Sequence, residues 1–163
     1  MSPDDLYDLP EMKELVDVIM AETGKVLDAF AVKRDSHYIT SMWANITHPN
    51  HRQDIHVHPN CFLSGLVKRS RLHQDAHELR ADAVRFAAQI HENFEPRYTA
   101  KNELNSDFII IPAEKGRMLI WPSHVPHAVE QGTADETEDR ITVPFNIMIR
   151  GRIELFTASL NLS

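Results

Sequence analysis

Two histidines, His56 and His58, stand two residues apart in the stretch DIHVHPNCFLSG at residues 54–65. The first half of this stretch has the composition of a β-strand, on which the side chains of residues i and i+2 leave the same face. Both imidazoles should therefore point the same way and lie close together. Neutral imidazole is the commonest protein ligand for iron, zinc, copper and nickel, but two imidazoles hold such an ion weakly. We therefore expect a third ligand from another part of the chain.

The best candidate for that third ligand is His127, in the stretch GRMLIWPSHVPHAVE at residues 116–130. This stretch has the pattern of a strand, a turn marked by two prolines, and a histidine that enters the next strand. A barrel brings ligands together from opposite strands in this way. The chain has ten histidines, so a chance pair is the alternative, and it is the second stretch that favours a metal site. We interpret His48 and His51, in a loop rich in Pro and Asn, as solvated rather than ligating.

Composition limits the classes of function. With 163 residues, the chain has the size of one domain that can bury a core without disulfide or metal staples. Its 42% hydrophobic and 25% charged residues are ordinary for a soluble globular protein. The formal net charge of −7 argues against nucleic-acid binding, which needs a basic surface. A small anionic substrate remains compatible with this charge through a local arginine.

Cysteine content and hydropathy predict a cytoplasmic protein without membrane contact. The single cysteine, Cys61, excludes an intramolecular disulfide and fits a reducing cytosol. Because it lies in an apolar run, we interpret it as a core residue rather than a reactive thiol. No apolar run approaches the roughly 20 residues that span a bilayer, and the acidic start MSPDDLYDLPEMKEL differs from a signal peptide. The sequence leaves open whether the chain forms a homodimer.

The elements that must position the histidines are one helix followed by several short strands. Apolar residues recur at helical spacing from Met12 to Phe30, with Pro10 suited to a first turn and Gly24 a candidate break. Alternating or continuous β-branched and aromatic residues predict strands around the HVH pair and at residues 38–47, 62–67, 107–112, 117–121, 140–149 and 152–156. The continuous apolar run at 107–112 predicts a buried strand, and a short tail follows the last strand.

Residues 68–101 carry the least regular pattern of the chain. Apolar residues three or four apart among charges predict an amphipathic helix limited by Pro96, and residues 83–88 admit a strand as an alternative. The basic cluster KRSR at 68–71 is most simply a solvated turn. The functional hypothesis for residues 68–101 is a lid that covers the site.

Together these elements predict a mainly β fold with flanking helices. One leading helix, several short strands, no internal repeat and no linker composition favour a single domain over residues 1–163. The expected architecture is a double-stranded β-helix, the jelly-roll barrel.

Four motifs occur in chain order: WAN at 43–45, HVHPNCFLSG at 56–65, GRMLIWPS and HAV at 116–123 and 127–129, and RITVPFN at 140–146. They resemble the motifs of the 2-oxoglutarate/Fe(II) oxygenases of the cupin-like superfamily. The resemblance covers about residues 8–68 and 105–148. It implies a jelly-roll barrel in which His56 and His58 supply the first metal ligands and His127 the distal one. It also implies Fe(II) and 2-oxoglutarate as cofactors.

The resemblance further implies that Arg140 anchors the cosubstrate carboxylate, with Thr142 and Asn45 beside it. The residue types agree with this role, because the planar guanidinium matches a carboxylate through two parallel hydrogen bonds. On a strand, Thr142 shares a face with Arg140 and adds a hydroxyl donor. The alternative for Arg140 is a surface salt bridge with Glu138 or Asp139.

The sequence departs from the better-known members of the superfamily in two respects. Those members use H-x-Asp or H-x-Glu, whereas His58 occupies the second position here and gives a ligand set with one less negative charge. Asn60, the next residue on the same strand face, is the alternative oxygen ligand. The chain after Gly65 also becomes helical and charged in pattern, so substrate contacts do not carry over from the resemblance.

The leading hypothesis is a non-haem Fe(II), 2-oxoglutarate-dependent oxygenase that hydroxylates an unidentified small molecule. A three-His cupin metalloenzyme without 2-oxoglutarate, either a dioxygenase or an isomerase, is the second hypothesis. A metal-binding or small-molecule-binding barrel without catalysis is the third. Arg140 pointing into the barrel, and succinate formation from 2-oxoglutarate, would separate the first hypothesis from the others.

Overall fold

The computed structural model describes residues 1–48, 51–68, 83–87, 99–100, 108–112, 114–130, 139–155 and 158–162. Within these ranges, two short 3-10 turns at Leu6–Asp8 and Pro10–Met12 precede one α-helix and a series of strands. The elements are α1 Lys13–Ala29, β1 Ser36–Met42, β2 Asn45–Thr47, β3 Gln53–His56, β4 Leu63–Lys68, β5 Ala83–Ala87, β6 Phe108–Pro112, β7 Met118–Pro122, β8 His127–Val129, β9 Arg140–Leu155 and β10 Ala158–Leu162.

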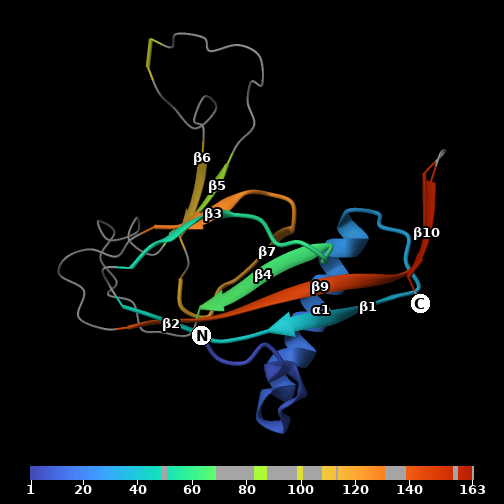
Figure 1. Ribbon diagram of the computed structural model, residues 1–163, viewed down its shortest axis with the longest axis horizontal. Helices are drawn as coiled ribbons and strands as arrows, with labels where there is room; N and C mark the ends of the chain where they lie inside the picture. The colour runs from blue at the N-terminus through green and yellow to red at the C-terminus, as the bar shows by residue number, and fades with distance from the viewer. Residues whose placement is uncertain are drawn as a thin grey trace.

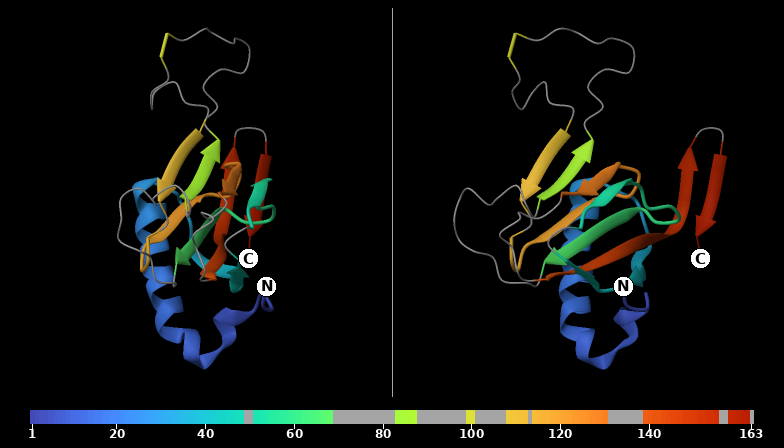
Figure 2. Two further views of the ribbon diagram at one scale, coloured as in Figure 1. Left: turned by 90° about the vertical axis from the view of Figure 1, so that its left-hand side faces the viewer. Right: turned by 60° about the vertical axis from the view of Figure 1, so that its left-hand side comes forward.

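The strands form two antiparallel sheets that lie against each other (Figures 1 and 2). The larger sheet has the order β1-β9-β4-β7, and β2 and β10 also pair with the long strand β9. The smaller sheet has the order β3-β8-β5-β6. The prediction of a mainly β, jelly-roll fold with a flanking helix is therefore confirmed.

Helix α1 crosses the outer face of the larger sheet, as Figure 1 shows. Its fully buried residues Ile19, Thr23 and Leu27 are spaced four apart and so form one stripe along the helix. Ile19 and Leu27 belong to a core cluster with Phe145 of β9 and other apolar residues of β1, β4 and β9. A second cluster lies between the two sheets and consists of Leu66, Val84, Phe86 and Trp121.

Strand alternation divides β9 into two faces with different tasks. Val143, Phe145, Ile147 and Ile149 belong to the cluster under α1. Because successive side chains of a strand point to opposite faces, Arg140, Thr142 and Asn146 lie on the face toward the barrel interior. Gly65 of β4 pairs with Phe145 of β9, and a Cβ atom at Gly65 would overlap the Phe145 ring. The absence of a side chain at Gly65 therefore allows this close packing of β4 on β9.

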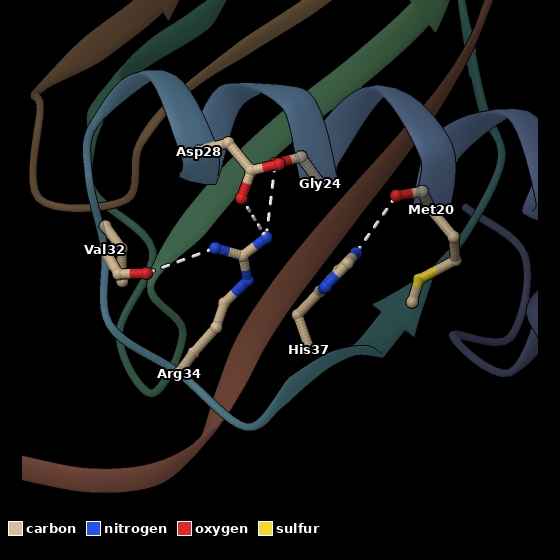
Figure 3. Close-up of polar contacts among 6 residues, drawn as sticks. All are labelled: Met20, Gly24, Asp28, Val32, Arg34 and His37. Carbon is tan, nitrogen blue, oxygen red and sulfur yellow. Dashed lines mark hydrogen bonds and ion pairs between the residues drawn. The ribbon is translucent and has the colours of Figure 1, made fainter.

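The chain leaving α1 is held to the last helical turns by two side chains (Figure 3). Arg34 donates hydrogen bonds to the carbonyls of Val32 and Gly24 at 3.1 and 3.3 Å and forms an ion pair with Asp28 at 2.8 Å. A cation at a helix C-terminus satisfies carbonyls that have no partner within the helix. The Nε2 of His37 lies 3.0 Å from the carbonyl oxygen of Met20, so this histidine supports the helix and not the barrel interior.

Several boundaries differ from the sequence-based expectation. The helix continues through Gly24, so the predicted break is wrong. The strand predicted at 38–47 is divided into β1 and β2. Between them Trp43 donates its N–H to the carbonyl of Pro144 in β9, and Pro144 has no N–H to donate in return. The two strands predicted at 140–149 and 152–156 form the single strand β9, and part of the predicted tail is β10.

The segment at 68–101 contains the largest differences. Residues Ala83–Ala87 form β5, which pairs with both β6 and β8, so the strand alternative is right there and the helix is wrong. The rest of the predicted helix, and with it the predicted lid, lies outside the described residues. Lys68 ends β4 with 0% of its surface exposed, so it does not belong to a solvated turn.

The strand at residues 108–112 is less buried than its apolar run predicts. Ile109 and Ile110 of β6 expose 55% and 47% of their surface. The reason is that β6 is the last strand in the order of the smaller sheet and, among the described residues, pairs only with β5. No helix in the described part of the chain is long and apolar enough to cross a membrane.

Candidate metal centre

Three histidine side chains come together at one end of the smaller sheet. His56 is the last residue of β3, and His127 is the first residue of β8; the two are paired across these antiparallel strands. One potential ligand atom from each of His56, His58 and His127 lies within 4.8 Å of the other two. The three rings are correspondingly close, with centroids 4.3 to 5.2 Å apart. A spacing of this size suits three nitrogens around one ion, each about 2.0 to 2.2 Å from the metal.

His56 and His58 lie close together, but not because they share a strand face as expected. Strand β3 ends at His56, so His58 is not on the same strand. The chain turns instead, and the N–H of His58 donates to the carbonyl of Ser123, in the segment that leads to β8, at 3.1 Å. His58 therefore reaches the cluster from beside the smaller sheet. The alternative ligand Asn60 is exposed and stands in a turn with a φ of 60°, whereas the His58 ring lies within the cluster.

Each of the three imidazoles has an oxygen partner at Nδ1. The Nδ1 of His56 lies 2.8 Å from the carbonyl oxygen of Asp54, and that of His127 lies 3.0 Å from the carbonyl oxygen of Val125. The Nδ1 of His58 lies 2.7 Å from the side-chain oxygen of Asn146. A carbonyl oxygen only accepts, so Nδ1 must carry the proton and Nε2 keeps its lone pair for a metal. This is the usual arrangement around metal-binding histidines.

Burial favours the neutral, metal-binding form of two of these rings. The pKa of His127 is lowered to about 4, chiefly by burial; the hydrogen bond with the Val125 carbonyl opposes this shift, and the nearby rings of His56 and His58 add to it. Burial likewise lowers the pKa of His58, with the hydrogen bond to Asn146 acting in the opposite direction. The indole of Trp43 stacks on His58, and that of Trp121 packs edge-on against His127, so aromatic walls shield the cluster. Three hydrogen-bonded imidazoles fit a divalent transition-metal ion.

A cavity of about 360 Å³ contains the three residues expected to hold the cosubstrate: Asn45, Thr142 and Arg140 all line it. Asn45 and Thr142 are paired across β2 and β9, which places them side by side. Gln53 also lines the cavity, and its side-chain nitrogen lies 3.4 Å from the Nε2 of His56. His56, His58 and His127 do not line this cavity themselves, so Gln53 is the contact between the cavity and the cluster.

Arg140 is buried, with 8% of its surface exposed, and Glu138, one of the two salt-bridge partners considered for it, lies outside the described residues. Its Nη1 donates to the carbonyl of Glu130 at 3.3 Å, which holds the guanidinium against the strand that follows His127. The neighbouring Asp139 pairs instead with His48 at 2.6 Å. Both His48 and His51 are exposed, in agreement with the interpretation of solvated loop histidines.

Two residues of this region were not assigned a role from the sequence. Gln53 connects the cavity to the cluster, and Asn146 is the hydrogen-bond partner of His58. The strand alternation of residues 140–146 already places Asn146 on the same face as Arg140. Its contact with His58 depends on the path of the chain after β3, which no local pattern reveals.

The two sheets and the three-His cluster define a jelly-roll barrel with a candidate metal site. A sequence model of one protein family, described as "Putative 2OG-Fe(II) oxygenase", matches residues 41–146. The chain therefore belongs to this family of 2-oxoglutarate/Fe(II) oxygenases, and the resemblance of the motifs is confirmed. The expected cofactors, Fe(II) and 2-oxoglutarate, are those of the family. Among curated proteins, none matches the chain.

Three solved structures share the fold at low sequence identity. An oxidoreductase of the 2OG-Fe(II) oxygenase family from Burkholderia pseudomallei is 12% identical with a TM-score of 0.60, over 86% of this chain and 59% of the other. A prolyl-4-hydroxylase from Pseudomonas putida is 10% identical with a TM-score of 0.57, over 88% and 69%. HygX from Streptomyces hygroscopicus, with nickel and 2-oxoglutarate bound, is 10% identical with a TM-score of 0.58, over 91% and 71%. The chain thus spans less than two thirds of the length of the Burkholderia protein.

Proposed function

We propose that the chain is an Fe(II)- and 2-oxoglutarate-dependent oxygenase that hydroxylates a small molecule. The observation that carries the proposal is the convergence of His56, His58 and His127 next to a cavity that contains a buried arginine. Three protein ligands leave coordination positions open for a cosubstrate and dioxygen. HygX, which has the same fold, holds nickel and 2-oxoglutarate.

In this proposal the protein's own residues bind and orient the metal ion and the cosubstrate, and they exclude water from the site. His56, His58 and His127 hold the ion through Nε2. Arg140 binds the distal carboxylate of 2-oxoglutarate through its planar fork, while Thr142 and Asn45 donate further hydrogen bonds. With Fe(II) and 2-oxoglutarate bound, dioxygen would be consumed with conversion of 2-oxoglutarate to succinate and carbon dioxide, and a substrate C–H bond would become C–OH.

The test measures succinate formed from 2-oxoglutarate by the Fe(II)-loaded protein. We expect the wild type to form succinate and the His127→Ala variant to lose both tight Fe(II) binding and succinate formation. His124→Ala is the matched control, because His124 lies three residues away and is exposed, so this variant should keep both. Succinate formation that survives His127→Ala would show that the site is misassigned.

The three-His ligand set supports a second candidate, a cupin metalloenzyme that does not use 2-oxoglutarate. In this candidate Arg140 would bind an anionic substrate directly. The same experiment separates the two candidates, since the second predicts tight metal binding without affinity for 2-oxoglutarate and without succinate.

A further inference from the structure

His58 differs from the other two histidines in what fixes its ring. The Nδ1 atoms of His56 and His127 face backbone carbonyls of residues two positions earlier in the chain, so the Nδ1 partner of each ring is part of the main chain. The Nδ1 of His58 faces the amide of Asn146. An amide can accept through its oxygen or donate through its nitrogen, so the orientation of this amide decides which nitrogen of His58 carries the proton.

We propose that Asn146 is a positioning residue that selects the metal-binding tautomer of His58. The inference rests on the proposed metal site and adds a residue to it. With the Asn146 oxygen toward His58, Nδ1 carries the proton and the Nε2 lone pair is available to the metal. With the amide reversed, the proton would move to Nε2 and His58 could not bind a metal there.

A row of three polar residues across neighbouring strands fixes the amide. Asn146 of β9 pairs with Ser41 of β1 on one side and with Ser64 of β4 on the other. Its nitrogen donates to the Ser41 hydroxyl at 2.9 Å, and the Ser64 hydroxyl donates to its oxygen, also at 2.9 Å. The Asn146 oxygen therefore accepts from Ser64 and His58 together, which uses both of its lone pairs.

The Cys61 thiol lies beside Ser64 but donates to another group. Its sulfur lies 3.5 Å from the carbonyl oxygen of His58, which can only accept, and 3.6 Å from the Ser64 hydroxyl oxygen. Sulfur is a weak acceptor, so the better acceptor for the Ser64 hydroxyl proton is the Asn146 oxygen. The reversed amide would leave the Ser64 proton only this weak acceptor.

The direct test is the tautomer of His58 in metal-free protein, measured by long-range proton–nitrogen correlation NMR at pH 8. In the wild type we expect all three cluster histidines to carry the proton on Nδ1. In Asn146→Leu, which has a similar shape but no acceptor, we expect His58 to lose this preference while His56 and His127 keep it. Asn146→Asp retains an oxygen acceptor and should restore the Nδ1–H form. A wild-type His58 protonated on Nε2, or an unchanged tautomer in Asn146→Leu, would overturn the inference.

The second readout is the affinity for Co(II), followed through its absorption spectrum. Loss of a hydrogen-bond partner of a metal-binding histidine typically weakens metal binding by about 10- to 100-fold, and we expect this loss for Asn146→Leu. Asn146→Asp should bind at least as tightly as the wild type. Asn161→Leu, on the exposed part of β10, is the matched control and should bind normally. Thermal unfolding of each variant separates a folding defect from a site defect.

The outcomes separate this inference from the proposed function. If the wild type and Asn146→Leu bind Co(II) equally and His58→Ala binds weakly, the metal site stands and the role of Asn146 is refuted. If the wild type does not bind Co(II), the proposed metal site fails whatever the tautomer result.

Discussion

Replacing Arg140 is the most specific test of the proposed cosubstrate site. The guanidinium is almost fully buried and is held in place by the Glu130 carbonyl, so its fork is desolvated and oriented before a ligand arrives. The protein has a formal net charge of −7, so long-range electrostatics do not favour a dianion and a local cation is required. A charge-assisted, two-pronged pair in such a position contributes on the order of 2 to 4 kcal/mol.

This free energy corresponds to an affinity loss of roughly 30- to 1000-fold for 2-oxoglutarate in Arg140→Ala. Arg140→Lys keeps the charge but loses the fork, so its affinity should be intermediate. Calorimetric titration of 2-oxoglutarate into anaerobic, Fe(II)-loaded protein would order the three proteins. Arg152→Ala, an exposed position on the same strand, is the control and should bind as the wild type does. Equal affinities for the wild type and both Arg140 variants would refute the assignment.

Three further predictions concern stability. Because burial lowers the pKa of His127 to about 4, the unfolded chain binds more protons than the folded one below about pH 6.5. The free energy of unfolding of metal-free protein should therefore stay at its plateau value above pH 6.5. It should fall by up to about 3 kcal/mol toward pH 4. Urea unfolding at pH 7.5 and 4.5 measures this fall, which should shrink in His127→Gln. Gly65→Ala should destabilise by about 1 to 3 kcal/mol or more, since its Cβ would overlap the Phe145 ring; a wild-type midpoint in urea would contradict this packing. Gly24→Ala should instead stabilise α1 by about 0.5 to 1 kcal/mol, because its Cβ meets only His37, at 3.5 Å, and a lower thermal midpoint would argue against the helix there.

The residues that we propose for the metal and the cosubstrate could be selected from the sequence because their signals are local. The H-x-H pair is a short pattern, the distal His127 follows a proline-marked turn, and alternation along residues 140–146 separates Arg140 from the core-facing Val143. Each of these signals needs only the chemistry of a residue type and the period of a strand.

The remaining features depend on contacts between distant segments. Residues 83–87 carry apolar spacing that also fits a helix, and it is pairing with β6 and β8 that makes them a strand. His58 joins the cluster through a hydrogen bond to Ser123, not through a shared strand with His56. The role of Asn146 requires the register of β9 with β1 and β4, which the sequence does not specify locally.

The spacing of residues along strand β9 restricts how the sequence of this site can vary among related proteins. Arg140 and Asn146 lie on one face of the same strand, six residues and about 20 Å of extended chain apart. One inserted or deleted residue between them would turn one of the two toward α1, while two would keep the face but shift the anchor by about 7 Å relative to the histidines. Length changes should therefore be absent from residues 140–146 in functional relatives. Changes in substrate specificity should then arise in other segments, whose length can change without altering the spacing of Arg140 and Asn146.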